Sequence, residues 1–392
     1  MTASLEAWQR ILDADYEPLL AEVDSAADLG LSLLQRLRKK YPRDIVEVAL
    51  DLCAGRRKAA TKFSDASRLL CDGAGVEQAT GSRVAAHKAR RFADAPRIVD
   101  LCCGIGGDTM AFAGLHRPVL AIDRSPARAF MAGHNARVET QALDIEGYVC
   151  DGDSWIHVDP SRREESTGKR LWHFADYDPG PAVLSPILAT APAAAVKLGP
   201  GVDWREIPER QTRELEFISD DGSLVQTVMW CGELCRAPGA HTATRLSADA
   251  GSDLTFTAKP DFALPVDETA GRYLLVPDPA LERAQLVAPR IARTGAAELA
   301  AGLGILTCQT PLDDPWFERH EILAELPWRE QKIREWLEEH DGGIVTVRTR
   351  DRAVSTDAVQ MALRGTGSTP FTLFGLRLDR RIVCFVAPGS AV

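Results

Sequence analysis

The stretch that decides the fold reads Ile98-Val99-Asp100-Leu101-Cys102-Cys103-Gly104-Ile105-Gly106-Gly107-Asp108-Thr109. It begins as a short apolar strand and runs directly into glycines, which let the backbone turn tightly and approach a ligand closely. A helix that starts on such a turn points its free N–H groups at that ligand. The segment therefore predicts a binding loop between a strand and a helix. By itself it also fits a dinucleotide site, although the third glycine of such sites is missing.

Acidic residues stand at consecutive strand ends around this loop. Asp100 comes immediately before the glycines, where a carboxylate can accept a hydrogen bond from a ligand's ammonium group. Asp123 ends the next strand, 19 residues after the first glycine, where an acid can accept from both hydroxyls of a ribose. Asp144 ends a weaker third strand, in position to accept from an adenine amino group. Two acids that follow closely, Asp151 and Asp153, compete for that role.

Strands and helices alternate on both sides of the loop. The predicted strands, with helices among them, are residues 98–101, 119–123, 138–143, 155–158 and 193–198. Two more strands, 215–219 and 224–230, flank an Asp-Asp-Gly turn and predict a hairpin. This order is typical of an α/β fold with a doubly wound, mainly parallel sheet and an antiparallel edge hairpin.

The chain divides into four predicted segments. Residues 1–80 form an N-terminal helical region, and residues 81–257 form the domain built on the sheet. Residues 258–271 contain two prolines and predict a linker. Residues 272–392 predict a small α+β domain, with a helix over 279–294 and a closing hairpin over 371–386.

Composition narrows the class of protein. The chain has 392 residues, of which 45% are hydrophobic and 26% charged, as in ordinary globular proteins. Its net charge of −10 argues against a protein coated in positive charge for indiscriminate nucleic-acid binding. Nine scattered cysteines, no signal peptide and no membrane span indicate a cytoplasmic protein with reduced thiols. No cysteine and histidine spacing indicates a metal site.

Three basic runs remain: residues 36–62, 88–91 and 162–163. The first holds nine Lys/Arg against three acids. A solvated helix face explains such a run about as well as a binding surface does.

The loop and its acids resemble the class I S-adenosylmethionine-dependent methyltransferases. The nearest likeness is the group with Asp-x-x-Cys-Gly-x-Gly-Gly, to which trimethylguanosine synthase belongs. The resemblance covers about residues 60–235 and implies a Rossmann-like sheet with S-adenosylmethionine as cofactor. It implies that Asp100, Gly104 and Gly106 surround the methionine part, Asp123 binds the ribose and Asp144 the adenine. The other predicted cofactor contacts are their neighbours Cys102, Gly107, Asp108 and Arg124.

A second resemblance concerns residues 272–388, which look like the THUMP-like domain found C-terminal to such methyltransferases in bacteria. It rests on the Pro277-Asp278-Pro279-Ala280 start, the helix with Arg283 and the closing hairpin. This likeness implies RNA as a partner.

Asp159-Pro160-Ser161-Arg162-Arg163 closes the fourth strand, where ligands of this fold bind. Methyl transfer is an in-line displacement, so the enzyme mainly has to align acceptor and donor. Asp159 and Pro160 are the predicted catalytic residues: the carboxylate orients an amine or hydroxyl acceptor or receives its proton, and the proline fixes the turn. Arg162 and Arg163 would clamp a phosphate. The plainer alternative is an Asp-Pro turn with two solvated arginines.

The sequence leaves the acceptor atom open. Amino-methyltransferases of this family usually carry Pro-Pro and an aromatic residue after the first motif position, whereas Ser161 and Arg162 stand there in this chain. A C5-pyrimidine mechanism would need a cysteine nucleophile near the fourth or fifth strand end, and none is present near the fifth. Trp172 and Phe174, in the loop that follows, either line an acceptor pocket or cover the cofactor site.

The leading hypothesis is therefore a methyltransferase that acts on RNA. One alternative is a methyltransferase of a small molecule or a protein, which the acidic balance suits. An RNA-binding protein that keeps the fold without catalysis is another, and a nicotinamide enzyme is the last. The sequence does not indicate an oligomeric state.

Overall fold

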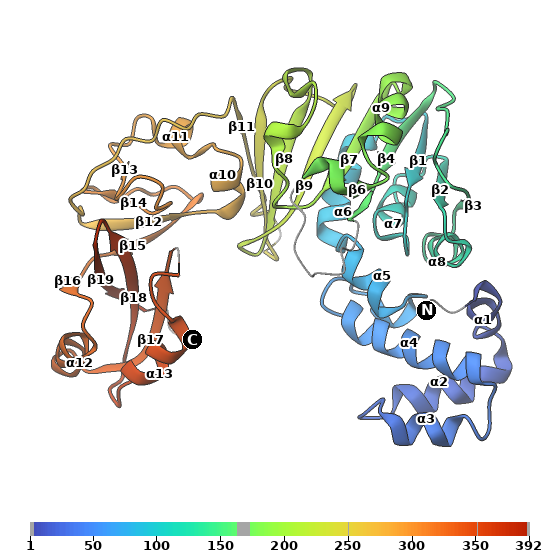
Figure 1. Cartoon of the computed structure of the whole chain (residues 1–392), viewed down its shortest axis with the longest axis horizontal. Coiled ribbons are helices and arrows are strands. Elements are labelled where there is room, and N and C mark those ends of the chain that lie inside the picture. Colours follow the sequence, from blue (N-terminus) through green and yellow to red (C-terminus); the bar gives the residue numbers. More distant parts are fainter. Residues whose placement is uncertain (1–3, 163–172, 250, 351, 390–392) are drawn as a thin grey trace. The chain divides into compact units, whose positions relative to one another are not determined.

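A computed structural model describes residues 4–162, 173–249, 251–350 and 352–389. The chain forms two compact units. The first contains residues 1–220, 225–240 and 246–252, and the second contains residues 221–224, 241–245 and 253–392. Figure 1 labels the elements of both units along the chain.

Five helices precede the large sheet: α1 (Leu5–Arg10), α2 (Glu17–Asp24), α3 (Leu31–Leu37), α4 (Arg43–Ala59) and α5 (Gly73–Gln78). The longest, α4, buries apolar residues at helical spacing, namely Ile45, Val48, Ala49 and Leu52. Their hydrophobic cluster also includes residues from the domain that follows, Ile105 and Met131. The N-terminal helices therefore share one core with the sheet domain.

The large sheet has nine strands in the order β11-β10-β8-β9-β7-β4-β1-β2-β3. The strands are β1 (Arg97–Leu101), β2 (Val119–Asp123), β3 (Glu139–Ala142), β4 (Ser154–Val158), β7 (Ala193–Leu198), β8 (Glu214–Asp220), β9 (Ser223–Gly232), β10 (His241–Leu246) and β11 (Leu254–Ala258). Its helices are α6 (Ser82–Ala89), α7 (Gly107–Ala113), α8 (Pro126–Ala136) and α9 (Pro181–Thr190). A short ladder, β5 (Ser161–Arg162) with β6 (Tyr177–Asp178), lies outside the sheet.

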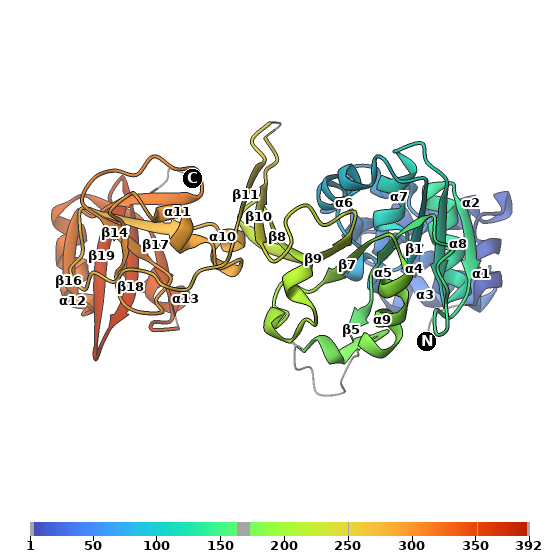
Figure 2. The same ribbon diagram turned by 90° about the horizontal axis from the view of Figure 1, so that it is seen from above.

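Strands β7, β4, β1, β2 and β3 are parallel to one another, and β9 is antiparallel to β7. Figure 2 shows α6 and α7 on one side of these strands and α9 on the other. The predicted doubly wound, mainly parallel sheet with an antiparallel edge is thus confirmed. The strand order reverses between β1 and β4, which is where ligands of open α/β sheets bind, outside the carboxyl ends of the strands.

The second unit contains two four-stranded sheets, in the orders β13-β14-β12-β15 and β16-β19-β18-β17. The strands are β12 (Tyr273–Pro277), β13 (Ala297–Glu298), β14 (Leu306–Cys308), β15 (Phe317–Glu321), β16 (Ala324–Pro327), β17 (Gly342–Thr349), β18 (Thr369–Leu378) and β19 (Arg381–Pro388). The helices are α10 (Pro279–Arg283), α11 (Val287–Ile291), α12 (Glu330–Glu339) and α13 (Thr356–Leu363). The last two pack against β17 through a shared hydrophobic cluster. The predicted small α+β unit is therefore present.

The predicted single helix over residues 279–294 is wrong. The chain forms two short helices there, because Gln285 adopts a left-handed conformation with φ +56° and interrupts the helical backbone. Within the described ranges, no helix is both long and apolar enough to cross a membrane.

Candidate functional site

A cavity of about 1650 Å³ opens at the carboxyl ends of β1, β2, β4 and β7. At one end it is lined by Gly104, Asp123 and Asp144, and at the other by Asp159 and Lys197. The typical volume of a small-molecule pocket is about 300–1000 Å³. This cavity therefore has room for two ligands side by side.

The glycine loop needs glycine for two different reasons. Gly104 has φ +57°, and a Cβ on it would meet nothing within 4 Å, so a ligand can lie directly against its backbone. Gly106 has φ +86°, and a Cβ there would lie 3.0 Å from Cα of Ala132 in α8. The first glycine keeps space in the cavity open, and the second lets the loop pack against a helix. Between β1 and these glycines, Cys102 also has a positive φ of +59°, and Gly107 begins α7.

Asp123 holds the loop in place from the end of β2. Its Oδ2 accepts a hydrogen bond from the amide of Gly104 at 3.0 Å, and its Oδ1 accepts from the amide of Ser125 at 2.9 Å. Burial raises the pKa of Asp123 above its usual range. The two backbone bonds fix the carboxylate at the wall of the cavity, with lone pairs left for a ligand.

The three acids that competed for the adenine position lie in different places. Asp144 lines the cavity, and its Oδ1 accepts from the amide of Glu146 at 3.0 Å. Asp151 precedes β4 and binds Ser154, and Asp153 lies beside it. Both therefore stand at the amino end of β4, away from the cavity. Arg124 lines the cavity and pairs with Asp178 at 2.9 Å, with most of its side chain exposed.

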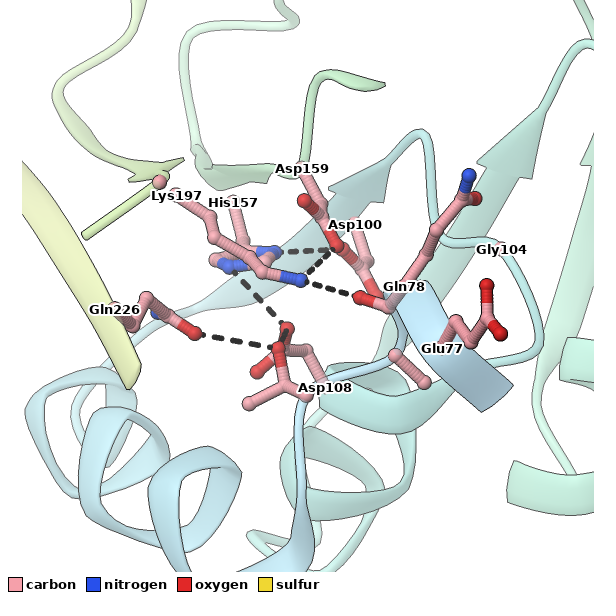
Figure 3. Close-up of polar contacts among 12 residues, drawn as sticks. Glu77, Gln78, Asp100, Gly104, Asp108, His157, Asp159, Lys197 and Gln226 are labelled. Carbon is pink, nitrogen blue, oxygen red and sulfur yellow. Dashed lines mark hydrogen bonds and ion pairs between the residues drawn. The ribbon is translucent and has the colours of Figure 1, made fainter. Parts of the chain in front are cut away.

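A buried polar network lies beneath the glycine loop (Figure 3). Asp100 is fully buried; its Oδ1 lies 2.7 Å from Nδ1 of His157, and its Oδ2 accepts from the Thr109 hydroxyl at 2.5 Å. Since Nδ1 of His157 donates to Asp100, Nε2 is left to accept from the ammonium of Lys88 at 3.2 Å. That ammonium also pairs with Asp108 at 2.7 Å. The carboxylate of Asp100 thus makes its contacts within the protein.

Asp108 is the second acid of this network. Its Oδ2 accepts from the hydroxyl of Thr80 at 2.7 Å. Burial disfavours its charged form, but the Lys88 ammonium outweighs that cost and holds the pKa of Asp108 well below its usual range. Two acidic side chains, Asp100 and Asp108, therefore lie on either side of His157 and Lys88 beneath the loop.

Sequence reasoning missed Lys88 and His157. Lys88 belongs to the basic run 88–91, but its side chain is fully buried, so its charge is not available to an RNA on the surface. Arg91, from the same run, is also mostly buried, between Glu214 and the ring of Trp230. The sequence does carry a sign of this burial: Lys88 follows Val84 by four residues, which places it on the apolar face of α6.

At the other end of the cavity, Asp159 follows β4 and its Oδ2 accepts from the ammonium of Lys197 at 2.6 Å. Burial raises the pKa of Asp159, and the Lys197 cation offsets part of that rise. The same ammonium donates to the carbonyl of Gln78 at 2.9 Å (Figure 3). Pro160 and Ser161 also line this end, and the Ser161 hydroxyl donates to the carbonyl of Asp178.

The end of α5 forms a wall of the cavity, which includes Glu77, Gln78 and Ala79. A second ammonium, that of Lys62, donates to the carbonyls of Val76, Glu77 and Ala79 at 2.8–3.2 Å. Two lysines thus satisfy the carbonyls at a helix end, where positive charge is favourable.

The beginning of α5 is tied to the sheet domain. Asp72, its N-cap residue, pairs with Arg128 of α8 at 2.9 Å. Gly75 lies so close to that guanidinium that a Cβ would collide with it. The wall is therefore anchored at both ends.

Four residues are predicted to contact the acceptor: Arg162, Arg163, Trp172 and Phe174. Arg163 and Trp172 lie outside the described residues, and for Arg162 only the backbone is described, in β5. Phe174 is buried and packs on Tyr177 with ring centroids 6.0 Å apart. Tyr177 lines the cavity, and its hydroxyl accepts from the amide of Gly199 at 2.7 Å.

Much of the basic run over residues 36–62 is paired within the protein. Arg36 and Lys40 contact Glu22, and Arg38 and Arg43 contact Glu47. These pairs favour the reading of this run as a solvated helix surface. In the described part of the chain, no group of three or more metal-ligating side chains is present.

Two segments of the chain match known protein families. Residues 95–170 match the family described as RNA cap guanine-N2 methyltransferase, and residues 317–387 match the family described as THUMP domain-like. Proteins of two Mycobacterium tuberculosis strains, each named an uncharacterized S-adenosylmethionine-dependent methyltransferase, are 31% identical over 345 residues. That alignment covers 82% of this chain and 90% of theirs.

Among solved structures, a protein from Porphyromonas gingivalis W83, described as a candidate methyltransferase, has the same fold. The TM-score is 0.73 at 16% identity, and the match covers 96% of this chain and 99% of that one.

The site also suits the cofactor of that family. S-adenosylmethionine carries positive charge, which the acidic side chains that line the cavity, such as Asp123 and Asp144, favour. Gly104 leaves backbone open to the cavity, and Asp123 lines its wall. The chain is therefore a class I enzyme with a THUMP-like domain, and it belongs to the S-adenosylmethionine-dependent methyltransferases.

Proposed function

We propose that the enzyme transfers the methyl group to RNA, with the acceptor entering the cavity beside Asp159. The observation that carries this proposal is that one continuous cavity is lined both by the glycine loop and by Asp159 and Lys197. Its volume of about 1650 Å³ leaves room for a nucleotide beside the cofactor.

At the donor end, we assign the ribose to Asp123 and the adenine to Asp144, because both line the cavity. Gly104 and Gly106, with Cys102 and Gly107, give the loop its shape against the methionine part. Asp100 and Asp108 lie beneath the loop, where their bonds to His157 and Lys88 hold them in place and their carboxylates favour a positively charged ligand. Arg124 covers the outer side of the ribose.

At the acceptor end, Asp159 orients the acceptor. One of its oxygens binds Lys197, and among the described residues its Oδ1 has no hydrogen-bond partner. That oxygen can accept a hydrogen bond from an amine or hydroxyl and take its proton. Pro160 fixes the turn, and Arg162 and Arg163 bind phosphate. S-adenosylmethionine, when bound, supplies an electrophilic methyl group on a sulfonium centre.

The choice of RNA rests on the two family matches, RNA cap guanine-N2 methyltransferase and THUMP domain-like. The basic runs add little to it, since residues 36–62 and 88–91 are largely paired or buried. Phosphate contacts are therefore expected from the arginines beside Asp159 and from the THUMP-like domain.

The test uses a strain that lacks the gene. Its total RNA, its protein and its small molecules are incubated separately with the purified enzyme and S-adenosylmethionine labelled in the methyl group. We expect label in RNA, sensitive to ribonuclease and absent with Asp159→Ala. Mass spectrometry of the nucleosides identifies the methylated atom.

The matched control is Asp153→Ala, an exposed acid at the far end of β4, which should retain full transfer. Label in the protein or small-molecule fraction, with none in RNA, would replace the RNA proposal by the alternative acceptor. The net charge of −10 is compatible with that alternative.

A further inference from the structure

Lys197 is a charged residue within an otherwise apolar strand, in the sequence Ala193-Ala-Ala-Val-Lys-Leu198. Its side chain is 16% exposed, and its ammonium lies between two segments that are far apart in the chain. The ammonium donates one hydrogen bond to Oδ2 of Asp159 and another to the carbonyl oxygen of Gln78 (Figure 3). An ammonium that makes two such bonds has little freedom, so it fixes the position of both partners.

The geometry points to Lys197 as a positioning residue for methyl transfer: its ammonium turns the free oxygen of Asp159 toward the acceptor and ties that carboxylate to the end of α5. This inference rests on the proposed role of Asp159 as the acceptor-orienting group.

A comparison with Lys62 separates two roles of Lys197: binding the end of α5 and binding Asp159. Both ammonium groups donate to carbonyls at the end of α5. The three bonds of Lys62 all go to backbone carbonyls, which uses its three protons and leaves none for a carboxylate. Among the described residues, Lys197 alone donates both to this wall and to Asp159, so the two lysines form a matched pair for the test.

The charges around Asp159 come from several elements. They are Lys197 on β7, Lys88 on α6, Asp108 on α7, Asp100 on β1, His157 on β4 and, farther out, Lys62 before α5. Lys197 is the cation in direct contact, and its charge lowers the pKa of Asp159 against the effect of burial. Removing that cation leaves a partly buried carboxylate without its partner, which favours the protonated form.

The experiment compares Lys197→Met with Lys62→Met in the full-length enzyme. The carboxyl carbon of Asp159 is followed by NMR as the pH changes, with Asp159→Asn used to assign the signal. We expect Lys197→Met to raise the titration midpoint by about 1 pH unit or more. Lys62→Met should move it by less than a third of that.

Activity supplies the second measurement. Because the ionised carboxylate is required, the acidic limb of kcat against pH should move upward with the midpoint in Lys197→Met. At the pH optimum, kcat should fall at least about tenfold while S-adenosylmethionine affinity changes less than about threefold. Lys197→Arg keeps the charge and serves if Lys197→Met fails to fold; its midpoint should stay near that of the wild type while kcat falls.

An unchanged Asp159 midpoint in Lys197→Met, or equal shifts in both lysine variants, would overturn the inference, as would a wild-type kcat in Lys197→Arg. Failure of the proposed function looks different, because then the wild type labels no RNA although the Asp159 midpoint still responds to Lys197.

Discussion

At the end of the cavity that we assign to the donor, the lining groups come from three short stretches at or just after a strand end: residues 100–108, 123–125 and 144–146. At the acceptor end they come from segments far apart in the chain, since 119 residues separate Gln78 from Lys197 and 38 separate Asp159 from Lys197. The donor end is shaped mainly by backbone and the acceptor end by side-chain charges. The first is therefore readable as a motif, whereas the second exists only after folding.

If the two ends of the cavity work separately, Asp159→Asn should give the largest effect of all the variants. It should lower the rate of methyl transfer and leave cofactor binding unchanged. The amide keeps the shape but cannot take a proton, so we expect kcat to fall about 10²–10⁴-fold. S-adenosylmethionine affinity, measured by calorimetry, should stay within about threefold. A comparable loss of cofactor binding would show that the two ends are not separable.

Asp123→Ala tests the donor end in the same way. It removes the carboxylate that binds the loop amides of Gly104 and Ser125 and, in our assignment, the ribose. Hydrogen bonds to a charged group contribute about 1.5–3 kcal/mol each, so affinity for S-adenosylmethionine should fall about 100-fold. Calorimetry measures it; unchanged affinity would refute the assignment of this end.

Substitutions of the two loop glycines should have different effects: one should mainly lower stability, and the other should mainly weaken cofactor binding. Gly106→Ala forces a Cβ against Ala132 and should destabilise the protein by about 1–3 kcal/mol, seen as a lower midpoint in urea. Gly104→Ala places its Cβ in open space and should cost about 1 kcal/mol for the left-handed backbone. Its cofactor affinity should nevertheless fall about tenfold. Equal effects on stability would contradict this division of roles.

The smallest effect is expected at Asp144, an exposed acid. Asp144→Asn should weaken S-adenosylhomocysteine binding less than about tenfold. The sharper readout is selectivity, since the variant should lose the preference for S-adenosylhomocysteine over S-inosylhomocysteine, which lacks the amino group. Asp151→Asn is the control and should keep that preference.

The sheet could be predicted because its strands are short apolar runs that end in acids or glycines. The predicted bounds of the parallel strands differ from the observed ones by at most one residue at either end. The helix over 279–294 failed because the left-handed turn at Gln285 has no signal of the kind that glycine or asparagine gives. At the site, Asp123 and Asp144 were found from their strand ends. Their assigned contacts stay predictions.

Lys88, His157 and Lys197 could not be found as a group, because each sits inside a helix or strand and meets its partners only through tertiary packing. Lys197 did carry a weak signal, as the one charge in an apolar strand. Such a residue must find a counter-charge when it is buried, and Asp159 is that counter-charge. A basic residue within a predicted buried strand therefore predicts an acidic partner, which can be sought among the acids at neighbouring strand ends.

The ion pair between Asp72 and Arg128, with Gly75 pressed against it, has a consequence for modularity. The family match that identifies the sheet begins at residue 95, yet one wall of the cavity comes from residues 77–81 and is anchored by this pair. A fragment cut at that boundary would keep the recognisable motif and lose the enclosure around it. The N-terminal helices are thus no detachable addition to the sheet domain: the cavity needs more of the chain than the segment that the methyltransferase family model matches.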